Sequence, residues 1–148
     1  MSSTMSSDDD GTAKRVLGVD PGGSRTGLAV SDPLGITAQG LETLVEKDQN
    51  QVVRYLAGLV DEYGVETVVI GMPLSLGGEE IEPSGRSRLL KKKLEEIRDV
   101  KVVLMDERMT SLESERVLRK AGRVRNRQAV DKLAAVLILQ SYLDGEFE

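Results

Sequence analysis

Residues 15–33 read RVLGVDPGGSRTGLAVSDP, and the architecture of the chain is built outward from this stretch. Two apolar runs, RVLGVD and TGLAVSD, flank a short connection of proline, glycine and polar residues, which is the pattern of two strands joined by a turn. Pro21 has the φ that suits the second position of a turn, and Gly22 is predicted to adopt the positive φ that a type II turn requires next. The first strand therefore ends on a carboxylate, Asp20. An ordinary turn aspartate and a functional group both fit that position.

Further strands and helices follow this hairpin, and short-range signals mark where several of them begin and end. Asp48 precedes a run with apolar side chains at helical spacing, and Gly64 closes that run as a C-terminal cap. Ser84 is predicted to cap the next helix, and Thr110 with Glu113 forms a T-x-x-E capping box for a third. The predicted elements are a strand over 37–45, a helix over 49–64, a buried strand over 66–73, a helix over 84–97, a buried strand over 100–107, and helices over 110–122 and 129–144.

This order of elements predicts an α/β fold with a mixed sheet, because a hairpin meander comes first and helices then alternate with strands. The 148 residues suit one domain with a core of its own, which we place over residues 14–144. The polar, acidic residues 1–13 are predicted to form a disordered tail, and residues 145–148 a short C-terminal tail. No signal peptide is expected, because the first residues lack an apolar segment.

The composition excludes several kinds of active site. The chain has no cysteine and no histidine, which excludes disulfides, thiolate or imidazole metal sites and every histidine-dependent nucleophile. A hydrolase with this composition would have carboxylates and a hard metal ion as its tools. The longest apolar run, residues 134–139, is far shorter than the roughly 20 residues that span a bilayer, so we expect a cytoplasmic protein without a membrane partner.

Two further acidic positions are comparable to that of Asp20. Asp106 and Glu107 end a predicted buried strand, and because side chains alternate along a strand, one of the two faces any given site. Asp131 lies one turn into the last predicted helix, within an apolar stretch where a free charge is costly. A functional role and stabilisation by the helix dipole both fit this position. Carboxylates at the ends of separate elements suit magnesium, which takes oxygen ligands and keeps some of its water. Two such ions about 3.5–4 Å apart can activate water against a phosphodiester.

Four blocks of this sequence, taken together, resemble the signature blocks of the YqgF family. They are VLGVDPGGSRTGLAVSD, VVIGMPLSLGGEE leading to SGRSR, VVLMDERMTSLES and VDKLAAVLILQSYLD, in the family's order and spanning residues 15–144. Members are described as candidate Holliday-junction resolvases and as candidate pre-16S ribosomal RNA nucleases, with an RNase H-like fold. The resemblance implies a mixed five-stranded sheet flanked by helices. It also implies that Asp20, Glu107 and Asp131 are the catalytic residues and the ligands of magnesium, or of manganese in its place.

One part of the family pattern is altered in this chain. The family usually has a threonine and a lysine after its Asp-x-Gly, whereas this chain has Gly23 and Ser24, followed by Arg25. Arg25 is therefore expected to supply the positive charge from one position later. An ion pair with a neighbouring acid is an equal alternative to substrate binding for Arg108, and residues 91–93, three lysines, are expected to form a solvated helix face.

Basic residues concentrate in one part of an acidic chain. Residues 1–85 carry 5 basic and 14 acidic side chains, whereas residues 86–132 carry 15 basic and 8 acidic ones, within a total net charge of −5. Such a segment suits a polyanion, and a solvated helix face is the alternative. With three tyrosines and one phenylalanine, base stacking contributes little, which favours recognition of structured nucleic acid through backbone charge and shape. The residues predicted to bind nucleic acid are Arg25, Arg86, Arg88, Arg108, Arg123, Arg125 and Arg127.

The leading interpretation is a magnesium-dependent endonuclease that acts on structured nucleic acid, with processing of the 5′ end of pre-16S ribosomal RNA as its foremost substrate. Resolution of branched DNA junctions is the first alternative, and a non-catalytic nucleic-acid-binding module with the same fold is an alternative of another class. An actin-like ATPase would share the sheet topology, but it needs two such domains, and 148 residues provide one. The sequence leaves open whether the protein acts as a monomer or as a homodimer.

Overall fold

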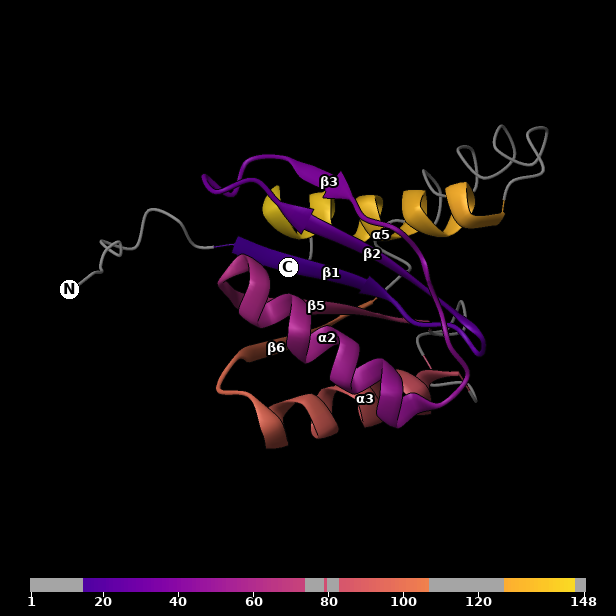
Figure 1. The fold of residues 1–148 in the computed structure, drawn as a ribbon. Helices are drawn as coiled ribbons and strands as arrows, with labels where there is room; N and C mark the ends of the chain where they lie inside the picture. Colours follow the sequence, from indigo (N-terminus) through magenta and orange to yellow (C-terminus); the bar gives the residue numbers. More distant parts are fainter. Residues whose placement is uncertain (1–14, 74–78, 80–82, 107–126, 146–148) are drawn as a thin grey trace.

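The computed structural model describes residues 15–73, 79, 83–106 and 127–145, drawn in colour in Figure 1, and of residues 127–131 the backbone alone. The tail predicted over residues 1–13 and the helix predicted over 110–122 therefore lie outside the described residues. So do the last three residues of the chain.

A mixed β-sheet forms the centre of the molecule. The strand β2 pairs antiparallel with both β1 and β3, whereas β1, β5 and β6 run parallel. The order of strands is β3-β2-β1-β5-β6, and the short β4 pairs with the start of β2. The mixed sheet predicted from the sequence is thus confirmed, but it has six strands instead of five, because the single strand predicted over 37–45 is divided into β3 and β4. The strands are β1 (Arg15–Asp20), β2 (Arg25–Ser31), β3 (Ala38–Gly40), β4 (Leu44–Val45), β5 (Val65–Met72) and β6 (Lys101–Asp106).

Helices cover both faces of the sheet (Figure 1). The helices α2 (Gln49–Tyr63) and α3 (Ser84–Ile97) bury one face, and α5 (Arg127–Leu143) buries the other. The larger core lies under α2 and α3, and its strand residues include Leu17, Val19 and Ile70, all fully buried. The smaller core lies under α5. This layering follows from continuous apolar strands, which must be covered on both sides.

The ends of α2 confirm the local signals in the sequence, and the start of α3 does not. The side chain of Asp48 accepts a hydrogen bond from the Asn50 N–H at 2.9 Å, and Gly64 ends α2 in the left-handed conformation with φ 64°. At α3, by contrast, Pro83 occupies the capping position and Ser84 is the first helical residue. The prediction that Ser84 caps this helix is therefore wrong. Its hydroxyl donates instead to the carbonyl of Pro73, at the end of β5.

A row of small residues lets α5 approach the sheet closely. Gly18 pairs with Ala29, and Ala29 pairs with Gly40, so the three residues form a line across β1, β2 and β3. A β-carbon on Gly18 would lie 2.7 Å from the Leu139 Cβ, which leaves no room for a side chain there. A β-carbon on Gly40 would lie 2.3 Å from the Lys132 Cγ. The line of small residues therefore sets the height of α5 above the sheet.

The direction of α5 follows from the contacts of its C-terminal half. The Gln140 side chain accepts a hydrogen bond from the Ala38 N–H and donates one to the Ile36 carbonyl, each at 3.0 Å, at the β2–β3 connection. Since β2 and β1 are antiparallel, this connection lies at the edge where β1 begins. The N-terminal end of α5 consequently lies toward the opposite edge, where β1 ends, as Figure 1 shows on the side of the β1 arrowhead.

Candidate active site

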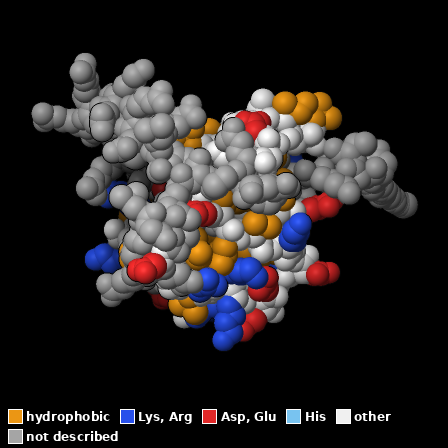
Figure 2. All heavy atoms as spheres, turned by 180° about the vertical axis from the view of Figure 1, so that it is seen from behind, with side chains coloured by type: hydrophobic (Ala, Val, Ile, Leu, Met, Phe, Trp, Pro, Cys, Tyr) orange, Lys and Arg blue, Asp and Glu red, His pale blue; other side chains and the backbone are white. Residues whose placement is uncertain are grey.

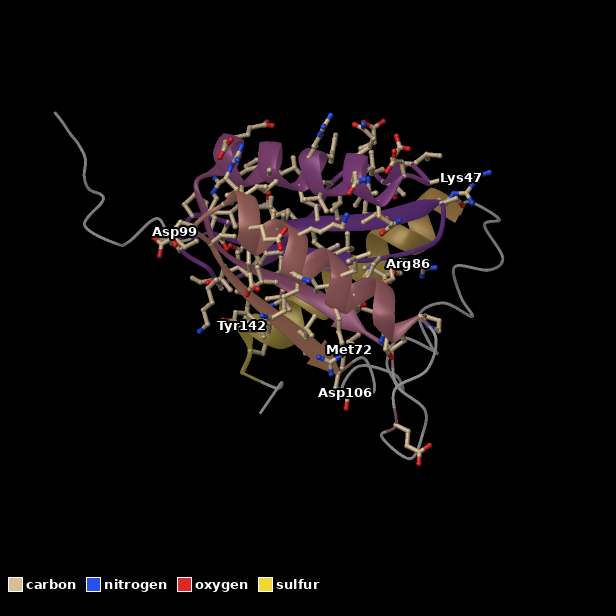
Figure 3. All side chains as sticks on the ribbon, turned by 90° about the horizontal axis from the view of Figure 1, so that it is seen from below. Lys47, Met72, Arg86, Asp99, Asp106 and Tyr142 are labelled. Atoms are coloured by element: carbon tan, nitrogen blue, oxygen red, sulfur yellow. The ribbon has the colours of Figure 1, made fainter. Side chains whose placement is uncertain are left out.

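The three parallel strands end at one edge of the sheet. Val19 pairs with Ile70, and Met72 pairs with Asp106, so Asp20 and Asp106 both lie within about one residue of this edge. In open α/β sheets, the edge at the carboxyl ends of the parallel strands is where ligands bind. Figure 3 shows Met72, Asp106 and Arg86 toward one end of the molecule, with Asp99 and Tyr142 toward the other.

Asp20 and Asp106 face opposite layers of the molecule. On β1, Leu17 and Val19 belong to the core under α2 and α3, whereas Val16 belongs to the core under α5. Alternation along the strand therefore directs the half-buried Asp20 to the side of α5. On β6, Met105 belongs to the core under α5, which directs Asp106 to the side of α2 and α3. Of the two candidate acids Asp106 and Glu107, the first is thus on the face away from Asp20.

The connection after Asp20 is tight for a different reason from the one predicted. Gly22 does not have a positive φ, so the type II turn predicted there is wrong. A β-carbon on Gly22 would lie 2.2 Å from the Arg25 carbonyl oxygen, so glycine is needed because the chain folds back onto itself. The Ser24 carbonyl accepts a hydrogen bond from the Glu46 N–H at 3.0 Å, which ties the connection to the end of β4. The turn is therefore fixed both by its own close packing and by this hydrogen bond from Glu46.

Two of the arginines predicted to bind nucleic acid flank this turn. Arg25 begins β2, where it pairs with Val45 of β4, and its Nε atom is buried. Arg86 belongs to the first turn of α3, yet its Nη2 atom lies 3.6 Å from the position of a β-carbon on Gly23. Arg25 thus follows the turn after Asp20 in the chain, and the guanidinium group of Arg86 lies against the same turn. Arg88 lies further along α3 and is exposed.

Two serines at the start of α3 contribute to this edge although the sequence did not predict them as site residues. Ser84 and Ser87 are both fully buried. The Ser87 hydroxyl donates to the Gly71 carbonyl at 2.7 Å, and the Ser84 hydroxyl donates to the Pro73 carbonyl. The signal for this role was available in the sequence as two serines three residues apart on either side of Arg86, at the start of a helix. Their partners, 16 and 11 residues earlier, could not be read from it.

Of the three lysines of α3 that were predicted to form a solvated face, Lys92 is exposed, whereas Lys91 and Lys93 are half-buried. Lys91 forms an ion pair with Glu95 at 2.7 Å on the exposed side of the helix, and Lys93 donates to the Asn50 side chain. Figure 2, which views the molecule from behind, shows Lys and Arg side chains mixed with Asp and Glu over its lower part. Lys47 is a basic residue that was not predicted to belong to the site. It lies exposed just beyond β4, toward the same end of the molecule as Arg86 in Figure 3.

Several predicted site residues lie beyond the side chains that the structure describes. Glu107, Arg108, Arg123 and Arg125 lie outside the described residues, and Arg127 and Asp131 are placed only as backbone positions in the N-terminal part of α5. Among the residues whose side chains are described, no group of three acids could hold a metal ion, and of the three predicted ligands only Asp20 belongs to that set. The metal site therefore stays a prediction. No described helix is long and apolar enough to cross a membrane.

Sequence comparisons find relatives that match nearly the whole chain. A family model described as "RuvX: Holliday junction resolvase" matches residues 14–145. A relative in Halalkalibacterium halodurans is 44% identical over 137 residues, covering 89% of this chain and 97% of its own length. Another in Pelotomaculum thermopropionicum is 42% identical over 135 residues, covering 89% and 88%. Both are named as candidate pre-16S rRNA nucleases.

Solved structures share the fold at low sequence identity. RuvC of Thermus thermophilus in complex with a Holliday junction substrate superposes with a TM-score of 0.59 at 16% identity, covering 89% of this chain and 94% of that one. A fowlpox virus resolvase bound to Holliday junction DNA superposes with a TM-score of 0.52 at 12% identity, covering 90% and 99%. These likenesses confirm the predicted RNase H-like fold. The family match confirms the resemblance to YqgF seen in the sequence, and the chain belongs to the RuvX/YqgF family of nucleases.

Proposed function

We propose that this protein is a divalent-metal-dependent endonuclease that hydrolyses phosphodiesters in structured nucleic acid, with Asp20 at its centre. The observation that carries the proposal is the placement of Asp20: it ends β1 at the edge where β5 and β6 also end, on the face covered by α5, beside a turn flanked by two arginines. A carboxylate in that position can hold a cation, and the arginines can receive the phosphate charge.

The chemistry of the acids at this edge fits a magnesium or manganese site. Glu107 follows Asp106 directly, so alternation along β6 favours its carboxylate on the face of Asp20. Asp131 lies in the first half of α5, whose N-terminal end is directed toward the same edge. We propose these three carboxylates as the metal ligands. The bound ions would supply an activated water and stabilise charge on the leaving oxygen.

The remaining residues would bind and orient the substrate. Arg86 and Arg25 flank the turn after Asp20, and a phosphate held between them would place its neighbouring phosphodiester near the carboxylates. The sugar–phosphate backbone, not base identity, would be the feature recognised, since few aromatic residues are available for stacking. This supports a structured substrate, which presents its phosphates in a fixed arrangement.

The names of the relatives support pre-16S ribosomal RNA as the substrate. We propose that cleavage occurs at its 5′ end, in a cytoplasmic role in ribosome biogenesis. The description of the family model supports a four-way DNA junction as the second candidate. The two substrates share a folded backbone with closely spaced phosphates. The same carboxylate and arginine groups would serve either one.

A direct cleavage experiment tests the proposal. The purified protein is incubated with a labelled pre-16S 5′ fragment and with a labelled four-way DNA junction, with magnesium, with manganese and with a chelator. We expect metal-dependent cleavage of the ribosomal fragment, and loss of that cleavage in Asp20→Asn. The matched control is Asp99→Asn, an exposed acid at the opposite end of the molecule. Binding of either substrate without cleavage under any condition would identify a non-catalytic module instead.

A further inference from the structure

The start of α3 is fastened to the end of β5 by two buried hydroxyl groups. Ser87 donates to the Gly71 carbonyl at 2.7 Å and Ser84 donates to the Pro73 carbonyl, and neither serine is exposed to solvent. Gly71 and Pro73 lie at and just after the end of the strand next to β1. These bonds connect the position of the helix to the position of the catalytic edge.

Arg86 lies between the two serines in the sequence, and its side chain extends toward Gly23 in the turn after β1. It is half-buried, and its Nη2 atom is 3.6 Å from the position that a β-carbon on Gly23 would take, which is ordinary van der Waals distance. Gly23 itself is exposed and does not have a positive φ. Its bare backbone therefore leaves space for the guanidinium at a position where a larger side chain would compete with it.

We propose that Ser84 and Ser87 are positioning residues, which hold Arg86 over the turn from Gly22 to Ser24 so that its guanidinium meets substrate phosphate beside Asp20. The inference rests on the proposed function, because nucleic acid is the ligand that Arg86 would bind. The physical reason is entropy: an arginine side chain has many rotamers, and a fixed helix start reduces the number that must be given up on binding. The serines touch no substrate and act only through Arg86.

The test is a double-mutant cycle in nucleic-acid affinity. The variants are Ser87→Ala, Arg86→Ala and the two combined, and the probes are a fluorescein-labelled four-way DNA junction and a labelled pre-16S 5′ fragment in buffer with chelator. Ser87→Ala should weaken binding by about threefold to tenfold, because a less fixed Arg86 side chain must give up more rotamers on binding. Arg86→Ala should weaken it further, and adding Ser87→Ala to Arg86→Ala should change affinity by less than about twofold.

Ser31→Ala is the matched control. Ser31 is also a buried serine, and its hydroxyl accepts a hydrogen bond from the Val16 N–H at 2.8 Å, at the far end of β2 from the turn. Its substitution should lower the melting temperature as Ser87→Ala does and leave affinity unchanged. Gly23→Val provides a second probe that keeps both serines. Its side chain should displace the guanidinium, and its effect should likewise disappear when Arg86 is alanine.

The outcomes separate the two proposals. A loss of affinity by Ser87→Ala that is equally large with and without Arg86 would overturn the positioning role, and so would a loss equal to that of Ser31→Ala. If Ser87→Ala does not fold, the double-mutant cycle is carried out with Gly23→Val and Arg86→Ala instead. Losses of affinity that add in that cycle would overturn the positioning role. Binding without cleavage by the unmodified protein would refute the nuclease proposal while the cycle still judges the serines. Absence of binding to both probes would refute both.

Discussion

Asp20 and Asp106 end parallel strands at the same edge of the sheet, but the first faces the layer of α5 and the second faces the layer of α2 and α3. Only one of the two acids can therefore point into a carboxylate cluster on a given side of the sheet. A cluster on the side of α5 would take its second strand-end acid from Glu107, which comes one residue later in the chain. Sequence spacing alone makes Asp106 and Glu107 equivalent, and the packing of Met105 distinguishes them.

Neutralising Glu107 and neutralising Asp106 should have unequal effects on cleavage. Glu107→Gln should abolish metal-dependent cleavage, because it removes the charge of a proposed ligand. Asp106→Asn should retain most of the activity, since its side chain lies on the other face. Both variants are compared in a single-turnover cleavage assay with magnesium. The reverse ranking would move the metal site to the side of α2 and α3.

Magnesium should raise the melting temperature of the protein. Three carboxylates held close together repel one another in the metal-free state, and a cation that binds only the folded form stabilises it by linkage. Thermal unfolding is followed by circular dichroism with and without magnesium. Asp20→Asn should shrink the magnesium-induced shift, while the metal-free variant stays as stable as the unmodified protein or gains stability. A full shift in Asp20→Asn would exclude Asp20 as a ligand.

The close approach of α5 to β1 makes Gly18 intolerant of a side chain. Gly18→Ala places a β-carbon 2.7 Å from the Leu139 Cβ, so the helix must move and unfolding should cost about 1–3 kcal/mol less. Cleavage should fall as well, because α5 carries Asp131. The control is Gly58→Ala in α2, where the new β-carbon would have no atom within 4 Å apart from its chain neighbours and the adjacent helix backbone. That variant should gain about 0.5–1 kcal/mol, measured by urea unfolding.

Stability at acid pH should depend on Asp32. Its carboxylate accepts hydrogen bonds from the backbone N–H groups of Thr37, Ile36 and Leu34, and the bond from Thr37 is the largest cause that lowers its pKa below the usual 3.8. A lowered pKa in the folded state means that the stabilisation is complete above the unfolded value and is lost as pH falls through the folded one.

The measurement is urea unfolding of the unmodified protein and of Asp32→Ala between about pH 6 and pH 2.5. Asp32→Ala should be the less stable at pH 6, because the β2–β3 loop loses its acceptor. The difference between the two proteins should begin to shrink near the ordinary pKa of 3.8 and should disappear as pH falls through the lowered folded-state pKa of Asp32. A difference that stays constant over the whole range would contradict the assignment.

Nucleic-acid binding should depend on the basic segment between residues 86 and 127. Each phosphate contact contributes about −0.7 to −0.9 to the slope of log affinity against log salt. Neutralising Arg123 and Arg125 together should flatten the slope by up to about 1.5 and weaken binding to different sequences alike. Neutralising Lys91 to Lys93 should do less, because Lys91 is paired with Glu95 and Lys93 with Asn50. A larger loss from the lysines would put the substrate on the face of α3.

Much of the fold was predictable because the signals that specify it are local. The caps of α2 at Asp48 and Gly64 depend on contacts within a few residues, and continuous apolar runs mark the buried strands without knowledge of their neighbours. The mixed sheet, the covering helices and the carboxylate at the end of β1 all follow from such signals. The absence of histidine and cysteine limits the available chemistry through composition alone.

Tertiary structure decided the features that depend on which groups the folded chain brings into contact. Gly22 was expected to have a positive φ, but what it needs is space for the Arg25 carbonyl, which only the folded turn brings near. Ser84 has the side chain of a helix cap, yet a carbonyl 11 residues earlier accepts its hydrogen bond. The face to which Asp106 points, and the reach of Arg86 to Gly23, likewise depend on which elements pack together. From its position in the sequence, a hydroxyl or a guanidinium group has several possible partners. The packing of helices and strands against one another decides which of these partners it meets.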